Sequence, residues 1–328
     1  MTAKDLKNAL LQEAVQGKLV PQIASEGNAR DLLEEIRRER LSHGLDFANA
    51  KSGKRKSKKK TALAGSNPCD ITEDEIPFDI PESWCWCRLG EIVYNNGQKT
   101  PDKEFSYIDI GSIDNEHQKL NEKENFIQPE NAPSRARKIV KKGDIIYSTV
   151  RPYLHNMCII DKDFEKEPIA STGFAVLACY PQINNQYLFY YLLSPSFDNY
   201  ANDTKNSKGV AYPAINDDRL YKGIVPLPPL AEQKRIVAAI EKFMPLIEEY
   251  GKKETELKAF NEQIGLLTKK AILQEAVQGK LVPQIAAEGN AKDLLEEIRK
   301  EKLSHGLDFA NAKSGKRKSK KETALAGS

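Results

Sequence analysis

The chain is poor in the residues from which metal and redox sites are built. Its 328 residues include five cysteines, four histidines and two tryptophans. The cysteines are odd in number and scattered, as in a cytosolic protein whose thiols stay reduced, so we expect no disulfide framework. Cys85 and Cys87 form the one close pair, and no histidine or further cysteine stands at zinc-ligand spacing from them. We therefore expect neither a metal nor any other cofactor.

Long apolar runs are also missing. No stretch approaches the roughly 20 apolar residues that a helix needs to cross a bilayer. The N-terminal residues MTAKDLKNALLQEA lack the apolar centre of a signal peptide. We expect a cytoplasmic protein without a membrane partner.

Complete catalytic and nucleotide-binding motifs are lacking too. Gly53-Lys54 has neither the upstream glycine nor the following Ser or Thr of a phosphate-binding loop. The segment 67–70 is a partial match to the Asn-Pro-Pro-Tyr motif of amino-methyltransferases, without the second proline and the aromatic residue. Pro101-Asp102 would suit the start of a nuclease-type metal site, but no acidic-x-Lys triplet follows before Asp203. The sequence favours a non-catalytic protein.

The formal net charge of +3 is small, but the charge is unevenly distributed. Lys51–Lys60 contains seven basic residues and no acid, and Lys313–Lys321 repeats the pattern. Such runs are typical of solvated linkers. They would also attract phosphates irrespective of sequence, and one run can serve both purposes.

The strongest internal signal is a duplication, because Lys7–Ser66 recurs as Lys269–Ser328 with seven differences in sixty positions. A solenoid would need several adjacent units, so two copies around one unique segment indicate a cyclic order of connector, domain and connector. In the first copy, Gly17 and Pro21 are expected to end one helix, and Asn28 to cap a second. The apolar face of that second helix comprises Leu32, Leu33, Ile36 and Leu41.

Between the copies the composition changes to that of a strand-rich domain. Short runs of β-branched and aromatic residues alternate with polar ones and are bounded by glycine, which predicts strands. The predicted strands are 107–110, 143–148, 157–160, 173–177 and 223–228, and residues 186–193 are predicted to form a buried helix. We expect an α+β protein. Its predicted divisions are a helical repeat with a basic linker (1–66), one globular domain (67–228), a long helix (229–278) and a C-terminal repeat with a basic tail (279–328).

A long amphipathic helix is predicted after Pro228 and Pro229, from Leu230 to about Gln278. Apolar residues recur at steps of three or four residues, or sums of these, and so form one seam. At about 1.5 Å per residue the helix would be roughly 70 Å long, which suits a spacer or a coiled-coil partner surface. Pro245 should kink it, and two or three shorter core helices are the alternative. The seam residues expected at a dimer or subunit interface are Ile236, Ile240, Phe243, Ile247, Leu257, Ile264 and Leu267.

Three polar clusters in the unique segment favour DNA binding. Arg135–Lys142 carries five positive charges, Arg151 and Tyr153 follow a predicted strand, and the loop 205–209 leads to further polar residues. Lys and Arg hold phosphates, while Arg and Asn can read guanine and adenine edges in the major groove. Each cluster alone is more often a solvated loop, but together they indicate a DNA-binding surface. The candidate residues are Lys99, Arg135, Arg137, Lys138, Ser148, Arg151, Tyr153, Asn156, Lys205, Lys208, Tyr212 and Asn216.

Five stretches in this order resemble the specificity subunits of Type I restriction–modification enzymes: QEAVQGKLVPQ, IPFDIPESWCWCRLGEIV, KKGDIIYSTVRPYL, IASTGFAVL and IVPLPPLAEQKRIVAAIEK. The resemblance covers essentially the whole chain. It implies target-recognition domains that read the halves of an interrupted site in double-stranded DNA. It also implies long conserved helices that separate those domains and dock the modification subunits. Methyl transfer from S-adenosylmethionine and ATP-driven cleavage would belong to the modification and motor subunits.

Carried onto this sequence, the resemblance makes Trp84 to about Pro228 one target-recognition domain. Leu230 to about Gln278 becomes the conserved spacer helix, in an antiparallel coiled-coil-like arrangement. Family members commonly carry two recognition domains, whereas here the second repeat stops where another would begin. A natural half-length subunit and a truncated or rearranged form both fit this departure.

Because the apolar surface is duplicated, we expect two copies to pair head to tail through their helices as a homodimer. Such a pair should prefer an interrupted palindrome. Two alternatives stay open. One is a helical scaffold without direct DNA readout, and a more distant one is a solitary methyltransferase.

Overall fold

The computed structural model describes residues 1–43, 71–203 and 214–304. It forms two compact units, Met1–Thr255 and Glu256–Ser328. The two basic runs, the Gly53-Lys54 and 67–70 motifs, and the candidate residues Lys205, Lys208 and Tyr212 lie outside the described residues.

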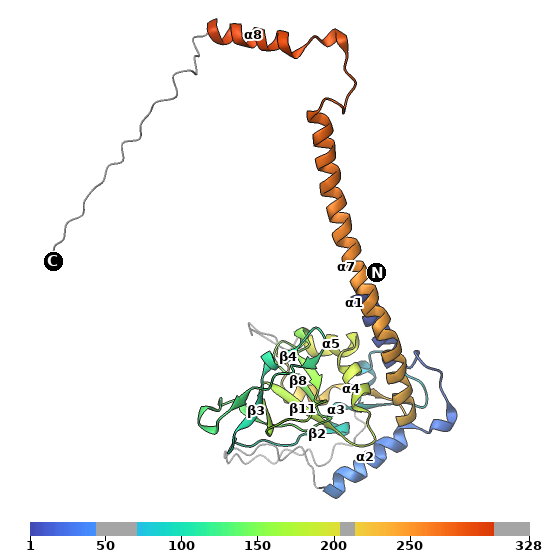
Figure 1. The fold of residues 1–328 in the computed structure, drawn as a ribbon. Helices are drawn as coiled ribbons and strands as arrows, with labels where there is room; N and C mark the ends of the chain where they lie inside the picture. Colours follow the sequence, from blue (N-terminus) through green and yellow to red (C-terminus); the bar gives the residue numbers. More distant parts are fainter. Residues whose placement is uncertain (44–70, 204–213, 305–328) are drawn as a thin grey trace, which may run out of the picture. The chain divides into compact units, whose positions relative to one another are not determined.

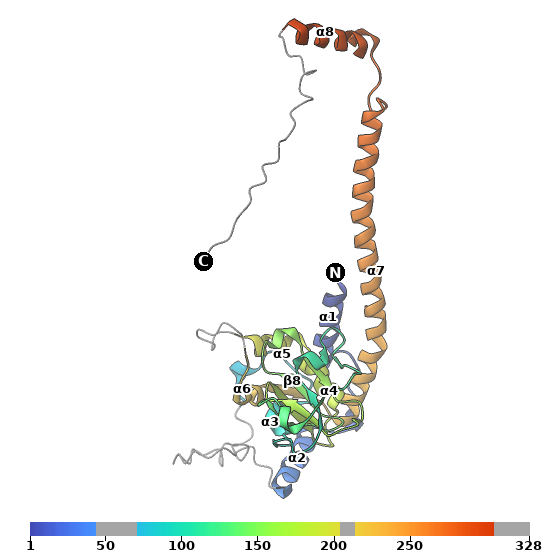
Figure 2. The same ribbon diagram turned by 60° about the vertical axis from the view of Figure 1, so that its left-hand side comes forward.

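The first unit contains most of the secondary structure (Figures 1 and 2). Its helices are α1 (Ala3–Val15), α2 (Ala29–His43), α3 (Leu89–Ile92), α4 (Asn185–Leu192), α5 (Pro195–Asn202) and α6 (Asp217–Lys222). Its strands are β1 (Cys85–Arg88), β2 (Val93–Tyr94), β3 (Phe105–Ile108), β4 (Ile113–Asp114), β5 (Lys119–Leu120), β6 (Phe126–Ile127), β7 (Ala136–Ile139), β8 (Ile145–Ser148), β9 (Met157–Ile159), β10 (Pro168–Ser171), β11 (Phe174–Cys179) and β12 (Ile224–Leu227). Short 3₁₀ helices are η1 (Ala24–Glu26), η3 (Glu73–Glu75), η4 (Ile110–Ser112), η5 (Pro129–Asn131) and η6 (Pro152–Leu154).

Helix α7 (Leu230–Val277) begins in the first unit and ends in the second. The second unit also contains η8 (Ala286–Glu288) and α8 (Ala291–Ser304). None of the helices in the described part of the chain is long and apolar enough to cross a membrane.

The strands form two four-stranded sheets, ordered β2-β11-β8-β9 and β6-β3-β10-β7, and two two-stranded sheets, β1-β12 and β4-β5. The β3–β10 pair is parallel, and the other strand pairs are antiparallel. The five predicted strands are confirmed as β3, β8, β9, β11 and β12, and the predicted buried helix as α4. The chain is therefore α+β, as expected.

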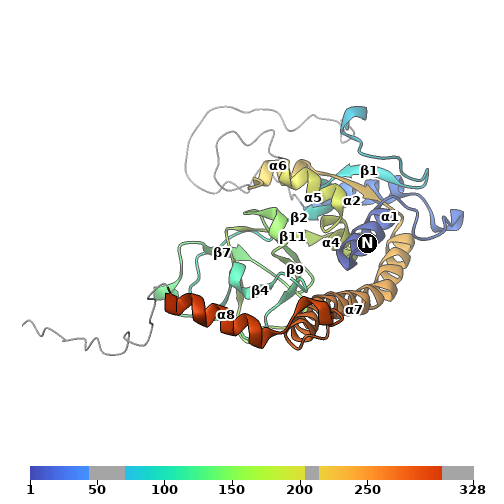
Figure 3. The same cartoon turned by 90° about the horizontal axis from the view of Figure 1, so that it is seen from above.

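The main core joins the strands to both N-terminal helices. Every residue of β8 is buried, as expected of a central strand covered on both faces. Seen from above, α1 lies beside α4 (Figure 3). Leu11 and Ile36, from α1 and α2, are at most 1% exposed, in one cluster with Tyr187 and Leu188 of α4. Helices α1 and α2 and the first turns of α7, which lie outside the predicted 67–228 domain, therefore pack in the same core as that domain. Leu41 departs from the predicted apolar face of α2, because its side chain is 82% exposed.

Helix α7 confirms the predicted long helix and excludes the alternative of shorter core helices. It runs without a break through Pro245. Its first turns belong to the core, where Ile236 and Ile240 are 0% exposed. The predicted role of these two residues at a subunit interface is therefore wrong, because the helix packs on its own domain before it emerges. Among the other predicted interface residues, Ile247 is half-buried, and the exposed ones are Phe243, Leu257, Ile264 and Leu267.

One buried carboxyl group makes stability depend on pH. Asp144 is 5% exposed, and its Oδ2 accepts hydrogen bonds from Asn96 Nδ2 (2.6 Å) and from the backbone N–H of Lys141 (2.7 Å). Burial raises the pKa of Asp144 to about 6. The unfolded chain thus releases this proton at a lower pH than the folded chain, so the group lowers stability as the pH rises from about 4 to about 6.

We predict that Asp144→Asn makes the protein more stable at pH 7, by about 3 kcal/mol, and changes little at pH 4. The amide oxygen can accept the same two hydrogen bonds, and the buried charge is removed. Urea unfolding at both pH values measures the difference, with Glu122→Gln at an exposed carboxylate as the matched control. An Asp144→Asn effect that does not change with pH would contradict the prediction.

Candidate nucleic-acid interface

Three segments that are far apart in the sequence meet beside the turn between β10 and β11. The Thr172 N–H donates to the Arg135 carbonyl at 2.8 Å, and the Thr149 N–H and hydroxyl both donate to the Gly173 carbonyl at 3.0 Å. Val150 forms a β-bridge with Ala214. The basic segment at 135–138, the loop after β8 and the segment from Ala214 to α6 are therefore neighbours. These segments correspond to the three polar clusters predicted from the sequence. Hydrogen bonds and a β-bridge bring the described parts of the clusters together.

The loop after β8 holds an unusual turn. Arg151 (φ 52°) and His155 (φ 50°) both adopt left-handed backbone conformations on either side of η6. For residues with a Cβ atom this conformation costs energy, and such strain persists only where surrounding contacts enforce it. Strained turns of this kind cluster at functional sites.

Side-chain contacts hold that turn in place. His155 Nε2 lies 2.9 Å from Asp198 Oδ1 of α5, and this hydrogen bond lowers the pKa of Asp198. Asn115 Nδ2 donates to the Leu154 carbonyl at 3.2 Å. Pro152 is buried, while Tyr153 is 48% and Leu154 36% exposed. The turn thus presents an aromatic and an aliphatic side chain from a fixed backbone.

Four of the candidate residues have side chains that are exposed or half-buried. Arg135 is exposed, Arg137 and Arg151 are half-buried, and Tyr153 is exposed. Arg137 is on β7, Arg135 directly precedes that strand, and Arg151 and Tyr153 belong to the η6 turn. Hydrogen bonds to the β10–β11 turn connect these segments. Three arginines and one tyrosine are residue types that suit phosphates and base edges together.

Three of the predicted DNA-binding residues, Lys138, Ser148 and Asn156, have side chains that are buried in the first unit. Lys138 is 4% exposed, with its Nζ 4.0 Å from Asp217 Oδ2. Ser148 donates its hydroxyl to the Val150 carbonyl at 2.9 Å, and Asn156 is 8% exposed. The sequence pattern selected them by residue type, but on these strands and turns they point inward. They support the surface rather than touch a ligand.

Lys99 and Asn216 have structural partners as well. The Lys99 Nζ pairs with Glu167 at 2.7 Å and with Asp102 at 3.2 Å, and the hydrogen bond to Glu167 is the main cause that raises its pKa. Lys99 is next to the basic segment, since its N–H donates to the Arg137 carbonyl. Asn216 is exposed and caps α6, where its Oδ1 accepts from the Arg219 N–H at 2.8 Å.

Sequence reasoning missed the residues that build the turn. The contact between His155 and Asp198 spans 43 residues. No local pattern marks a left-handed arginine, because Gly, Asn and Asp are the usual residues there. Among the described residues, no group of three or more His, Cys, Asp or Glu side chains is placed to hold a metal ion.

Comparison with known proteins gives consistent matches. The family model described as "Type I restriction modification DNA specificity domain" matches residues 81–259. The EcoAI specificity subunit of Escherichia coli is 26% identical over 342 residues, which covers 91% of this chain and 55% of that protein. The EcoEI specificity subunit of Escherichia coli is 25% identical over 255 residues, covering 74% of this chain and 41% of that protein. The chain thus spans about half the length of these relatives.

Two solved structures are similar as well. The HsdS subunit from Thermoanaerobacter tengcongensis is 34% identical, with a TM-score of 0.50 over 60% of this chain and 50% of that chain. A chain from work on complex assembly and conformational transition of the type I R-M system is 32% identical. Its TM-score is 0.51 over 66% of this chain and 53% of that chain.

We predict that Arg151→Ala weakens binding to a duplex selected from a random pool by about 1–3 kcal/mol, and weakens binding to unrelated duplexes much less. The reason is that a base contact discriminates between sequences, whereas a phosphate contact does not. A fluorescence titration measures both losses. Lys123→Ala, at an exposed lysine of the same unit, is the control. An equal loss on every duplex would assign Arg151 to a phosphate instead.

Proposed function

The chain belongs to the family of Type I restriction–modification DNA specificity domains, and we propose that it recognises one half of an interrupted DNA site for such a system. The observation that carries this proposal is the convergence of three segments at the β10–β11 turn, next to the strained η6 turn. Arg135, Arg137, Arg151 and Tyr153 are accessible at this place. A rigid surface matters because base readout requires side chains fixed relative to the groove.

We propose that the modification subunits dock on the helices. Beyond the core, α7 exposes apolar side chains that its own chain does not cover within the described residues. These exposed residues include Phe243, Leu246, Leu257, Phe260, Ile264, Leu266 and Leu267. A surface helix with so many uncovered apolar residues is typical of a protein-binding surface. Motor and nuclease subunits would join through the modification subunits, and catalysis would reside in these partners.

We also propose that two copies pair head to tail as a homodimer. One recognition domain reads one half-site, and an interrupted site has two. A two-fold pair would therefore read two identical half-sites in opposite orientation, separated by a gap that the helices determine.

A helical scaffold without direct DNA readout is the rival function. The exposed apolar residues of α7 would serve it equally well. The cationic and aromatic surface at the η6 turn favours recognition, because a scaffold has no need of it.

We predict that the chain together with its modification subunit binds duplex DNA with an affinity that falls steeply with salt. Each neutralised phosphate contributes a slope of about −0.9 in log K against log salt concentration. Fluorescence anisotropy between 50 and 200 mM salt would measure this slope, on the order of several units for a site of this kind. Absence of binding at low salt, with the modification subunit present, would favour the scaffold.

In cells that express the chain with its modification subunit, we predict methylation at one interrupted palindrome, in which the two half-sites are inverted copies of each other. Long-read sequencing maps the modified bases. Cells expressing the modification subunit alone are the control. Methylation at a continuous or asymmetric site would exclude a symmetric pair of reading domains.

A further inference from the structure

The N-terminal repeat, residues 7–43, is part of the core of the first unit. Six of its apolar residues are at most 4% exposed, in one cluster with α4 and the start of α7. These residues are Leu11, Ala14, Val15, Ala29, Leu33 and Ile36. We call the surface of the first unit that the N-terminal repeat covers the docking face, and it includes Ser83, Trp84, Glu91, Glu232 and Arg235.

Polar contacts fix how the N-terminal repeat lies on the docking face. Gln22 Nε2 donates to Glu232 Oε1 at 2.5 Å, and Glu26 pairs with Arg235 at 2.6 Å. On α2, Arg37 pairs with Glu91 at 3.0 Å.

Gly17 makes the closest approach to the docking face. A Cβ atom at this position would lie 2.5 Å from Pro81 Cγ, so only glycine fits.

The C-terminal repeat, residues 269–304, contains the residues with which the N-terminal repeat contacts the docking face. In the C-terminal repeat the large apolar ones among them are exposed. The six apolar positions and the Gln, Glu, Arg and Gly described above are all identical in the two repeats. None of the substitutions between residues 7–42 and 269–304 falls on a buried position. Four of the apolar counterparts are exposed large side chains, namely Leu273 (56%), Val277 (89%), Leu295 (53%) and Ile298 (39%).

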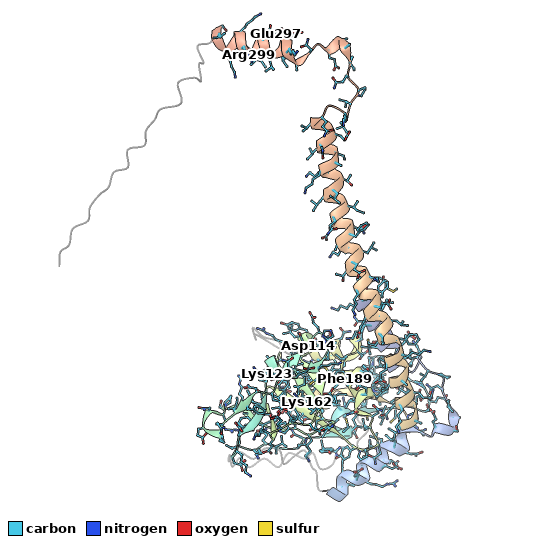
Figure 4. The ribbon with its side chains drawn as sticks, in the orientation of Figure 1. Asp114, Lys123, Lys162, Phe189, Glu297 and Arg299 are labelled. Atoms are coloured by element: carbon cyan, nitrogen blue, oxygen red, sulfur yellow. The ribbon has the colours of Figure 1, made fainter. Side chains whose placement is uncertain are left out.

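Around Gly279, the C-terminal repeat also has the same backbone conformation as the N-terminal repeat has around Gly17. Gly279 has φ 68°, against 71° for Gly17. Gln284 Nε2 donates to the Gly279 carbonyl at 3.2 Å, as Gln22 does to Gly17 at 3.3 Å. Figure 4 shows Arg299, the counterpart of Arg37, on α8. A segment that keeps its bound shape while its apolar residues are uncovered is preorganised for binding.

We propose that the C-terminal repeat of one copy docks on the docking face of a second copy, in place of that copy's N-terminal repeat. This proposal rests on the homodimer proposed above and specifies how it is built. The occupant is a second copy because residues 269–277 belong to α7, and the docking face contains α7 residues as well. Two stretches of one unbroken helix cannot pack side by side, so a chain cannot fill its own docking face in this way.

The contacts between α1 and α7 predict the register of the pair. The Ala3 N–H donates to Glu254 Oε2 at 2.9 Å, and a Cβ on Gly251 would lie 3.0 Å from the Ala3 side chain. Burial lowers the pKa of Lys7, and the nearby carboxylate of Glu248 opposes this by raising it. Because Ala3 lies against Glu254 and Lys7 lies near Glu248, α1 runs antiparallel to α7. These two helices lie side by side in Figures 1 and 2.

In the exchanged pair, Gly265 of one copy takes the place of Ala3 against Gly251 of the other. Lys258 lies midway between Gly251 and Gly265, seven residues from each of them. In an antiparallel two-fold pair, Lys258 of one copy therefore faces Lys258 of the other copy across the axis.

The first test compares matched substitutions in the two repeats of the full chain. Ile298→Glu should weaken self-association at least tenfold in analytical ultracentrifugation and leave the unfolding temperature of the monomer unchanged, because Ile298 is exposed there. Ile36→Glu should expel the N-terminal repeat. The chain should then stay folded as a dimer whose unfolding temperature rises with concentration, since the C-terminal repeat of the partner fills the docking face.

The double variant Ile36→Glu/Ile298→Glu should lose both the dimer and the folded core. If Ile36→Glu alone unfolds to the same extent as the double variant, the exchange is excluded. If Ile298→Glu leaves the dimer intact, the pairing is through other residues and the exchange is again excluded.

The second test places a cysteine at the predicted two-fold axis. Lys258→Cys should cross-link to itself under mild oxidation, and the unsubstituted chain gives the background from its own thiols. Lys252→Cys is the control, because its two sulfur atoms would be about 20 Å apart along the helix axis. Equal cross-linking of the two variants would overturn the register. Neither test uses DNA, so a failed exchange is distinguishable from a failed proposal of DNA recognition.

Discussion

The structure of the first unit depends on one buried carboxylate, that of Glu232. It is 1% exposed, at the start of α7, and it accepts hydrogen bonds from Trp84 Nε1 at 2.9 Å and from Gln22 Nε2. Burial raises the pKa of Glu232. Three segments that are remote in sequence are joined here, namely helix α7, the lead-in to β1 and the N-terminal repeat. A buried acceptor of this kind is costly unless its donors are present, so it ties the helix to one orientation on the domain.

This constraint separates two roles along α7. Its first turns are core, where Ile236 and Ile240 are inaccessible, and only later residues can meet a partner. The start of α7 is therefore fixed to the first unit directly after Pro228 and Pro229, because Gln233 and Glu232 are hydrogen-bonded into that unit.

The candidate interface shows a similar division between support and contact. Lys138, Ser148 and Asn156 are inside, and Arg135, Arg151 and Tyr153 reach the surface. The left-handed conformations at Arg151 and His155 are enforced by contacts to α5 and to Asn115. Backbone strain at this turn is balanced by packing elsewhere, which is how a rigid reading surface can stand on a loop.

The sequence by itself determined the element types, the long helix, the duplication and the family. The element types and the long helix are local properties, since helical period, strand alternation and turn residues are visible within a few positions. The duplication and the family follow from residue identities alone, without any packing. It could also indicate which clusters are basic, but not which side chains in them are accessible. The tertiary structure decided that, because accessibility depends on contacts between distant segments. The two repeats give the clearest case: Ile36 is 0% exposed and Ile298 is 39% exposed, although the residues around them are nearly identical. Local sequence specifies the same helix and the same apolar face twice, and only the surface available to pack against that face determines whether it is buried.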